Sequence, residues 1–302
     1  MNNRPAVPRL VRLSLALTIA AIIPATASAQ RAEGSFQRAL TVGASPDVEI
    51  SAGSGRIEVR AGSANRIEIT GRIRAGDWGD GWFGGGTRLS PQERVRRVEA
   101  SPPVEQSGNR IKIGYFTNDD WRNNVSISFT VALPTSANVI ARTGSGSQRI
   151  EGVSGSVESH AGSGSLTLKD IGSRLRASTG SGSISVDGVR GALHLTSGSG
   201  TVRAAGITGG VTASTSSGGL TVEGELSDDW RLSASSGSVS VHLPRRQGFE
   251  VDVTTGSGSI DVDFPVTVNG KVGRRSLRGS AQGGGRLLHV RTSSGRVSIR
   301  PT

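Results

Sequence analysis

Residues 181–198 read SGSISVDGVRGALHLTSG, and residues 199–216 read SGTVRAAGITGGVTASTS, so the second stretch repeats the pattern of the first. Both copies begin with Ser-Gly and carry an apolar–polar–apolar triplet soon after it. A fixed period of this kind indicates a repeat architecture, in which each unit stacks on its neighbours. The repeat, rather than any single motif, therefore decides the fold class.

The Ser-Gly step recurs along most of the chain. Its glycines are evenly spaced over five consecutive copies: Gly146, Gly164, Gly182, Gly200 and Gly218. The interval then becomes irregular, and further copies end at Gly55, Gly237, Gly258 and Gly295. A flexible Gly/Ser linker would not keep apolar pairs in such a register, so we reject a linker.

Each repeat contains two short strands that begin nine residues apart. Ile184-Ser185-Val186 alternates apolar and polar residues, and Leu193-His194-Leu195 does the same. Alternation with a period of two places one set of side chains inward. We predict an all-β, single-stranded parallel β-solenoid with about 18 residues and two strands per coil, built from nine to eleven coils. A left-handed hexapeptide helix fits less well, because Arg190 stands six residues after Ile184, where an apolar residue is needed.

The two ends of a solenoid expose strand edges, which can template aggregation. Arg296, Arg300 and Pro301 surround the last strand of the sequence. We expect these residues to discourage edge pairing at the C-terminal end.

The repeat disappears between Thr70 and Asn124. Ser90-Pro91-Gln92-Glu93 has the serine cap, the proline and the glutamate that begin a helix, here expected to run to about Ala100. Strands are expected at 109–114 and 125–133. Aromatic and acidic residues gather in the loops of this insertion, and those that could stack on a sugar and bind its hydroxyls are Trp78, Trp82, Asp119 and Trp121. The alternative is that these side chains only pack over the helix or an open end of the solenoid.

Residues 1–29 have the layout of a secretory signal. Arg4, Arg9 and Arg12 precede the apolar run 13–23, and Ala27-Ser28-Ala29 provides small residues at the cleavage position. We therefore expect an exported, periplasmic or extracellular protein without a transmembrane segment or cysteine. Its organisation is expected to be a signal peptide (1–29) and a single β-solenoid domain (30–302). The domain divides into first strands (48–71), aromatic loops and a short helix (72–124), regular coils (125–263) and irregular C-terminal coils (264–302).

The chain is basic. Its formal net charge of +11 becomes +8 once the three signal arginines are removed. Basic exported proteins associate with anionic surfaces. The expected partners are anionic polysaccharide or the envelope surface, or another envelope protein; no nucleic-acid motif is present.

We expect no catalytic residue, cofactor or metal ligand. The histidines His160, His194, His242 and His289 are predicted not to share a repeat column, and the Gly-Ser turns lack the aspartates of calcium β-rolls. The column of Glu151, Lys169, Asp187, Ala205 and Glu223 reads as a solvated stripe of mixed charge. Trp230 is expected to anchor the place where the period slips by one residue.

The segment 124–134, then Ala137-Asn138-Val139 and the repeated Thr/Ser-Gly-Ser-Gly-Ser turns, resembles the bacterial putative-adhesin family of β-strand-repeat domains of unknown function. The resemblance extends from Val48 to Ile299 and implies an architecture without catalytic residues to transfer. We expect a non-enzymatic adhesin or envelope-surface protein. The alternatives are a structural or sensory periplasmic protein that binds another protein, and a polysaccharide-active β-helix enzyme.

Overall fold

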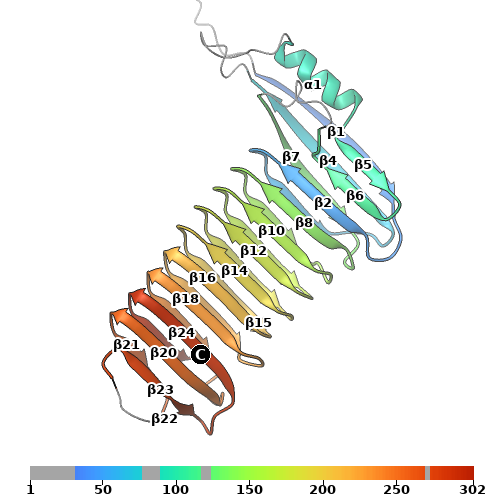
Figure 1. The fold of residues 1–302 in the computed structure, drawn as a ribbon. Helices are drawn as coiled ribbons and strands as arrows, with labels where there is room; N and C mark the ends of the chain where they lie inside the picture. The colour runs from blue at the N-terminus through green and yellow to red at the C-terminus, as the bar shows by residue number, and fades with distance from the viewer. Residues whose placement is uncertain (1–30, 77–88, 117–123, 269–272) are drawn as a thin grey trace, which may run out of the picture.

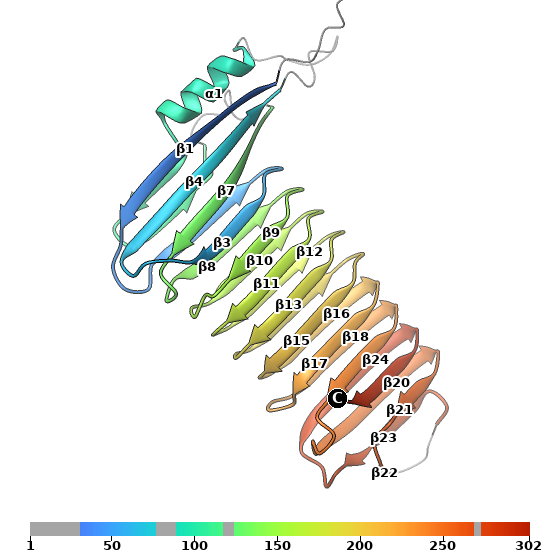
Figure 2. The same ribbon diagram turned by 180° about the vertical axis from the view of Figure 1, so that it is seen from behind.

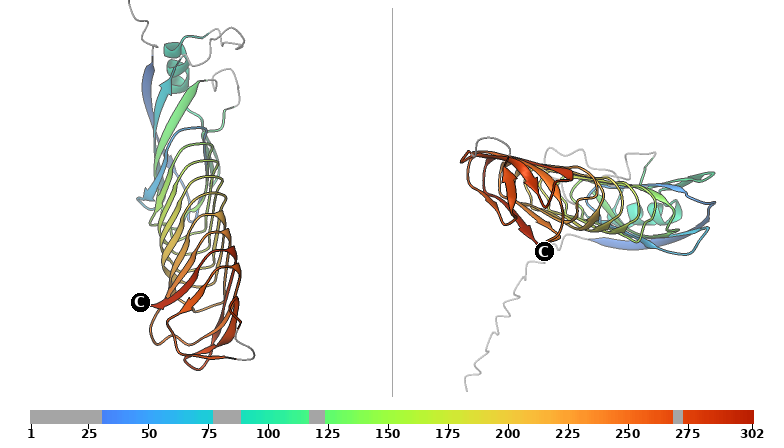
Figure 3. Two further views of the ribbon diagram at one scale, coloured as in Figure 1. Left: turned by 90° about the vertical axis from the view of Figure 1, so that its left-hand side faces the viewer. Right: turned by 90° about the horizontal axis from the view of Figure 1, so that it is seen from below.

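The computed structural model describes residues 31–76, 89–116, 124–268 and 273–302, which form an elongated stack of strands (Figure 1). Two sheets face each other, and Figure 3 shows them edge-on as the walls of a flattened coil. The helix α1 (Pro91–Ala100) lies at one end of the stack, and the hairpin of β22 (Val266–Val268) and β23 (Ser276–Ala281) lies at the other. The predicted fold class is confirmed.

The strands of the described residues belong to two sheets. The first sheet contains, in spatial order, β1 (Ala32–Thr41), β4 (Arg66–Ala75), β7 (Val125–Leu133), β3 (Ile57–Ala61), β9 (Gln148–Glu151), β11 (Leu166–Ile171), β13 (Ile184–Val189), β15 (Val202–Thr208), β17 (Leu220–Glu225), β19 (Val239–Leu243), β25 (Val297–Pro301) and β21 (Ile260–Val262). The second sheet contains β22, β23, β20 (Phe249–Ser257), β24 (Arg286–Ser294), β18 (Trp230–Ser236), β16 (Val211–Ser217), β14 (Leu193–Ser197), β12 (Leu175–Thr179), β10 (Val157–Ala161), β8 (Asn138–Thr143), β2 (Asp47–Ala52), β6 (Arg110–Ile113) and β5 (Val104–Ser107).

One coil consists of a strand of the second sheet, a Ser-Gly turn and the next strand of the first sheet. Ile184 in β13 pairs in parallel register with Leu166 of the preceding coil and with Val202 of the following coil. Ile184 and Val186 are buried, and Ser185 between them is exposed. Each buried aliphatic side chain contributes roughly 1.5–3 kcal/mol through the hydrophobic effect, so stacking stabilises coils that are too small to fold alone. Within the described residues, ten strands of the second sheet are each followed in the sequence by a strand of the first sheet, which agrees with the nine to eleven coils predicted.

The order of the coils in space differs from their order in the sequence at both ends. The coil of β2 and β3 lies between β6/β7 and β8/β9, and the coil of β24 and β25 lies between β18/β19 and β20/β21 (Figure 2). The expectation that Arg296, Arg300 and Pro301 protect an outer edge is therefore wrong, because β25 pairs on both sides. At this end the outer strand of the first sheet is the three-residue β21, and a short edge strand is itself poor at templating aggregation.

The Ser-Gly column has a steric cause. A Cβ on Gly182 would collide with the carbonyl oxygen of Gly164 in the neighbouring coil, and Gly164 stands in the same relation to Gly146. Turns at the spacing of parallel strands, about 4.8 Å, can pass this closely only without side chains. Glycine at this column therefore allows the coils to stack.

Buried hydroxyl groups just before these turns satisfy the glycine carbonyl oxygens. Thr179 Oγ1 donates to the carbonyl oxygen of Gly164 at 3.0 Å, and Ser197 Oγ donates to that of Gly182 at 3.3 Å. In the sequence, these buried threonines and serines cannot be distinguished from the serines of the turns. Their burial matters because an unsatisfied buried carbonyl group costs free energy.

Two irregular positions keep their polar atoms satisfied inside the core. Gln148, which replaces the first apolar residue of its coil, accepts a hydrogen bond from Ser159 Oγ at 2.7 Å and donates to Thr143 Oγ1 at 3.0 Å. Trp230 is fully buried and donates from Nε1 to the carbonyl oxygen of Gly209 at 2.9 Å. Trp230 pairs in register with Val211, one position beyond the regular interval, and therefore anchors the slipped period as predicted.

The N-terminal end is covered by α1. Val95 and Val98 of the helix are buried where α1 packs on β1 and β4. The predicted capping box is present: Glu93 N donates to Ser90 Oγ at 3.3 Å, and Ser90 N donates to the Glu93 carboxylate at 2.9 Å. The strand β1 was not predicted, because Gly34 interrupts its apolar alternation.

Candidate functional site

The aromatic and acidic loop residues predicted to bind a ligand lie outside the described residues. These are Trp78, Trp82, Asp119 and Trp121. Residues 1–29, which are expected to form a signal peptide, also lie outside them.

The outer faces of the two sheets carry different side chains. On the first sheet, Lys169 pairs in register with Glu151 and Asp187, and its Nζ lies 4.0 Å from an Asp187 oxygen. Lys169 and Asp187 are exposed, so this column is the solvated mixed-charge stripe that the sequence predicted. The outer face of the second sheet carries two polar networks and two depressions, which are described below.

The prediction for the histidines is wrong in one respect. His194 and His289 share an outer column of the second sheet, because Thr212 and Arg231 lie between them in register. The slipped period and the inserted C-terminal coil hide this relation in the sequence. The two histidines are three coils apart, so the shared column does not bring them together as metal ligands. Within the described ranges, no cluster of His, Cys, Asp or Glu side chains could hold a metal ion.

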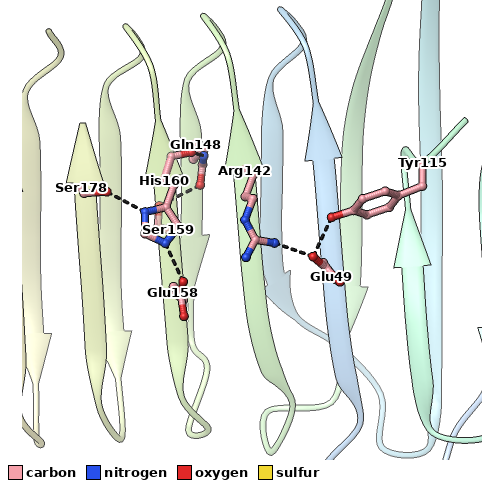
Figure 4. A network of polar contacts seen from close by, with 8 residues as sticks. All are labelled: Glu49, Tyr115, Arg142, Gln148, Glu158, Ser159, His160 and Ser178. Carbon is pink, nitrogen blue, oxygen red and sulfur yellow. Dashed lines mark hydrogen bonds and ion pairs between the residues drawn. The ribbon is translucent and has the colours of Figure 1, made fainter. Parts of the chain in front are cut away.

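Glu49 links three parts of the chain on the outer face of the second sheet (Figure 4). It accepts a hydrogen bond from Tyr115 Oη at 2.6 Å and forms an ion pair with Arg142. The hydrogen bond from Tyr115, followed by the charges of Arg142 and Lys112, lowers the pKa of Glu49 against the opposing effect of partial burial. Burial and the hydrogen bond to Glu49 raise the pKa of Tyr115. This network connects residues that are 66 and 93 positions apart in the sequence.

A second network contains a serine, a histidine and a glutamate (Figure 4). His160 Nδ1 lies 2.6 Å from Ser178 Oγ, and His160 Nε2 lies 2.6 Å from Glu158 Oε1. The hydrogen bond with His160 lowers the pKa of Glu158. Serine, histidine and an acid also occur together in acyl-transfer enzymes. Such enzymes in addition need free N–H donors aimed at the developing oxyanion. The backbone around these residues instead pairs with both neighbouring strands, because β10 lies between β8 and β12 and β12 lies between β10 and β14. This arrangement fits an inter-coil link better than a catalytic site.

A furrow of about 680 Å³ runs along the second sheet between two outer columns of side chains. Arg110 and Lys112 of β6 stand at one end, and Arg174, just before β12, and Arg176 of β12 stand at the other. The strands β2, β8 and β10 between them, with Ser156 just before β10, supply the rest of the lining, which consists of Asp47, Val48, Glu49, Asn138, Val139, Ile140, Ser156, Val157 and Glu158.

A second depression, of about 320 Å³, continues in the same direction beyond β12. It begins at the same Arg174 and Arg176 and reaches Arg231 of β18 across β14 and β16. Its floor includes Ala192 and Gly210, and His194 lies beside it. Burial, followed by the charge of Arg176, lowers the pKa of His194. We call the two depressions together the axial furrow.

The basic residues of the axial furrow are not among the site residues predicted from the sequence. A signal was present: Arg110-Ile111-Lys112 and Arg174-Leu175-Arg176 both place basic residues on either side of a buried aliphatic residue. The two triplets lie far apart in the sequence and follow different turns. The strand order places both triplets on the second sheet, where β2, β8 and β10 lie between β6 and β12.

The fold and this face define a parallel β-solenoid repeat protein with a polar, grooved sheet. Residues 93–300 match the family model described as Toastrack DUF4097, so the chain belongs to the Toastrack DUF4097 family. No match is found among curated proteins.

Three solved structures are similar to this chain, which covers nearly all of each. A protein from Bacteroides fragilis, described as a putative adhesin, has 12% identity, a TM-score of 0.46, and coverage of 89% of this chain and 97% of its own. A putative adhesin from Parabacteroides merdae has 8% identity, a TM-score of 0.40, and coverage of 89% and 96%. A putative cell adhesion protein from Clostridium sporogenes has 11% identity, a TM-score of 0.25, and coverage of 89% and 100%. In the described part of this chain, no helix has the length and hydropathy needed to span a membrane.

Proposed function

We propose that this chain is a non-enzymatic exported protein that binds anionic or glycan surfaces of the cell envelope. The exposed arginines of the second sheet carry the proposal. Among the described residues, Arg174 and Arg176 form no salt bridge; Glu158, in register with Arg176, is hydrogen-bonded to His160, and Glu49, three coils away, pairs with Arg142. Arginines outside salt bridges attract anionic ligands, and a net basic charge increases this attraction.

The architecture suits a binding scaffold. Ladders of backbone hydrogen bonds and buried aliphatic columns hold the outer positions at a constant spacing, so the backbone needs little reordering on binding. The structural relatives described as adhesins are consistent with this role. Residues 1–29 have the layout of a secretory signal, which supports the proposed export.

A glycan array containing acidic and neutral glycans, probed with the processed full chain, tests this function. We expect binding to acidic glycans at low salt that is lost at high salt, because screening weakens exposed charge interactions. Binding to no acidic glycan would overturn the proposal. Salt-resistant capture of one envelope protein, without glycan binding, would favour the alternative of a structural or sensory partner protein.

A further inference from the structure

We infer that the axial furrow is a binding site for a linear anionic polysaccharide, which lies along the solenoid axis and is held by Arg174 and Arg176. This inference rests on the proposed function and deepens it by naming the site and the class of ligand. Its first support is position: Arg174 and Arg176 line both depressions and are exposed.

The acidic residues of the furrow cancel this charge only in part. Glu49 pairs with Arg142 and Asp228 lies 3.9 Å from Arg286, and both arginines lie outside the lining of the furrow. Asp229 lies 3.6 Å from Arg231, within the furrow. Along β6 to β12, the four cationic groups Arg110, Lys112, Arg174 and Arg176 therefore outnumber the two remaining acids, Asp47 and Glu158.

The direction of the furrow indicates a linear ligand. Four coil steps separate β6 from β12, which corresponds to about 19 Å at the spacing of parallel strands. A compact anion would contact only one of the two basic ends. An extended polyanion can contact both ends and continue past Arg176 toward Arg231.

The floor of the furrow favours a polysaccharide over a membrane surface. Ser156 and Thr212 are exposed and can bind sugar hydroxyls, and the half-buried Ile140 offers an apolar surface to a sugar ring. A bilayer surface is flat on this scale, whereas the furrow is a depression about four coils long. A single narrow chain can instead enter between the two columns.

Two charge-matched variants test this inference. Arg174→Ala/Arg176→Ala removes two positive charges from the furrow, and Arg60→Ala/Arg203→Ala removes two from the outer face of the first sheet, where both arginines are exposed. Affinity for a short oligogalacturonate is measured by calorimetry in the full chain. We expect the furrow variant to lose about tenfold or more in affinity, and the control to lose less than about twofold.

Equal losses in the two variants would overturn the furrow as the site while leaving anionic binding in place. Failure of the unmodified protein to bind either oligogalacturonate or a sulfated dextran would overturn the proposed function itself. Binding to phosphatidylglycerol vesicles that depends on Arg174 and Arg176, without binding to either polysaccharide, would reassign the furrow to a membrane surface. Circular dichroism and thermal unfolding of each variant establish that it is folded.

Discussion

Gly182 lies against the carbonyl oxygen of Gly164 in the neighbouring coil, without room between them for a side chain. Gly182→Ala should therefore force two coils apart and lower the free energy of unfolding by about 1–3 kcal/mol, a cost typical of overpacking. Gly219→Ala is the matched control, because a Cβ there would meet no atom within 4 Å. Urea denaturation measures both. Equal stability of the two variants would show that the Ser-Gly column has another cause.

The order of the C-terminal coils can be tested by disulfide formation in a chain without native cysteine. Ser294 pairs in register with Ser236 on one side and with Ser257 on the other. A Ser236→Cys/Ser294→Cys variant should therefore oxidise readily. Ser236→Cys/Ser257→Cys should not, because two coil steps of about 4.8 Å exceed the reach of a disulfide. The reverse result would indicate coils stacked in sequence order.

The buried pair Gln148 and Ser159 should show strong energetic coupling. Gln148→Leu leaves the Ser159 hydroxyl without its partner, and Ser159→Ala leaves the Gln148 amide oxygen without its donor. Each single change should cost about 1–3 kcal/mol, the penalty of an unsatisfied buried polar group. The double variant resembles Leu166 and Ala177 of the next coil and should cost less than the sum. Additive losses in a double-mutant cycle would argue against the pair acting as a unit.

Much of this fold could be predicted from the sequence, because the repeat, the strand alternation and the helix cap are local patterns. The coil order could not, because every coil offers its neighbours the same ladder and the same apolar columns. The copy at Ser294-Gly295 therefore looks like an outlying last coil, although it lies inside the stack. The furrow depends on the same long-range order, since β2 lies between β6, which carries Arg110, and β8. The strand β1 could not be predicted, because Gly34 interrupts its apolar alternation and because the helix that packs on it, α1, lies about 50 residues further along the chain.

Acid should remove the stabilising contribution of Glu49. The pKa of this carboxyl lies below its ordinary value of 4.5, chiefly because of the hydrogen bond from Tyr115 and then the charges of Arg142 and Lys112. A lowered carboxyl pKa stabilises the fold above the unfolded-state value, and this contribution is lost as the pH falls through the folded-state value. The difference in unfolding free energy between the unmodified protein and Glu49→Gln should therefore be largest near neutral pH and shrink below pH 4.5. Glu58→Gln, on the first sheet, is the control acid; a difference that persists unchanged in acid would contradict this role of Glu49.

Thiol protection tests the axial furrow as the binding site most directly. Ser156→Cys places a single thiol in the furrow, and Ser185→Cys places one on the exposed outer face of the first sheet. The rate of alkylation by iodoacetamide is measured with and without saturating oligogalacturonate. We predict that the ligand slows alkylation at position 156 and leaves the rate at position 185 unchanged. Unchanged alkylation at position 156 under conditions where the ligand is bound, or equal protection at position 185, would contradict the furrow as the site.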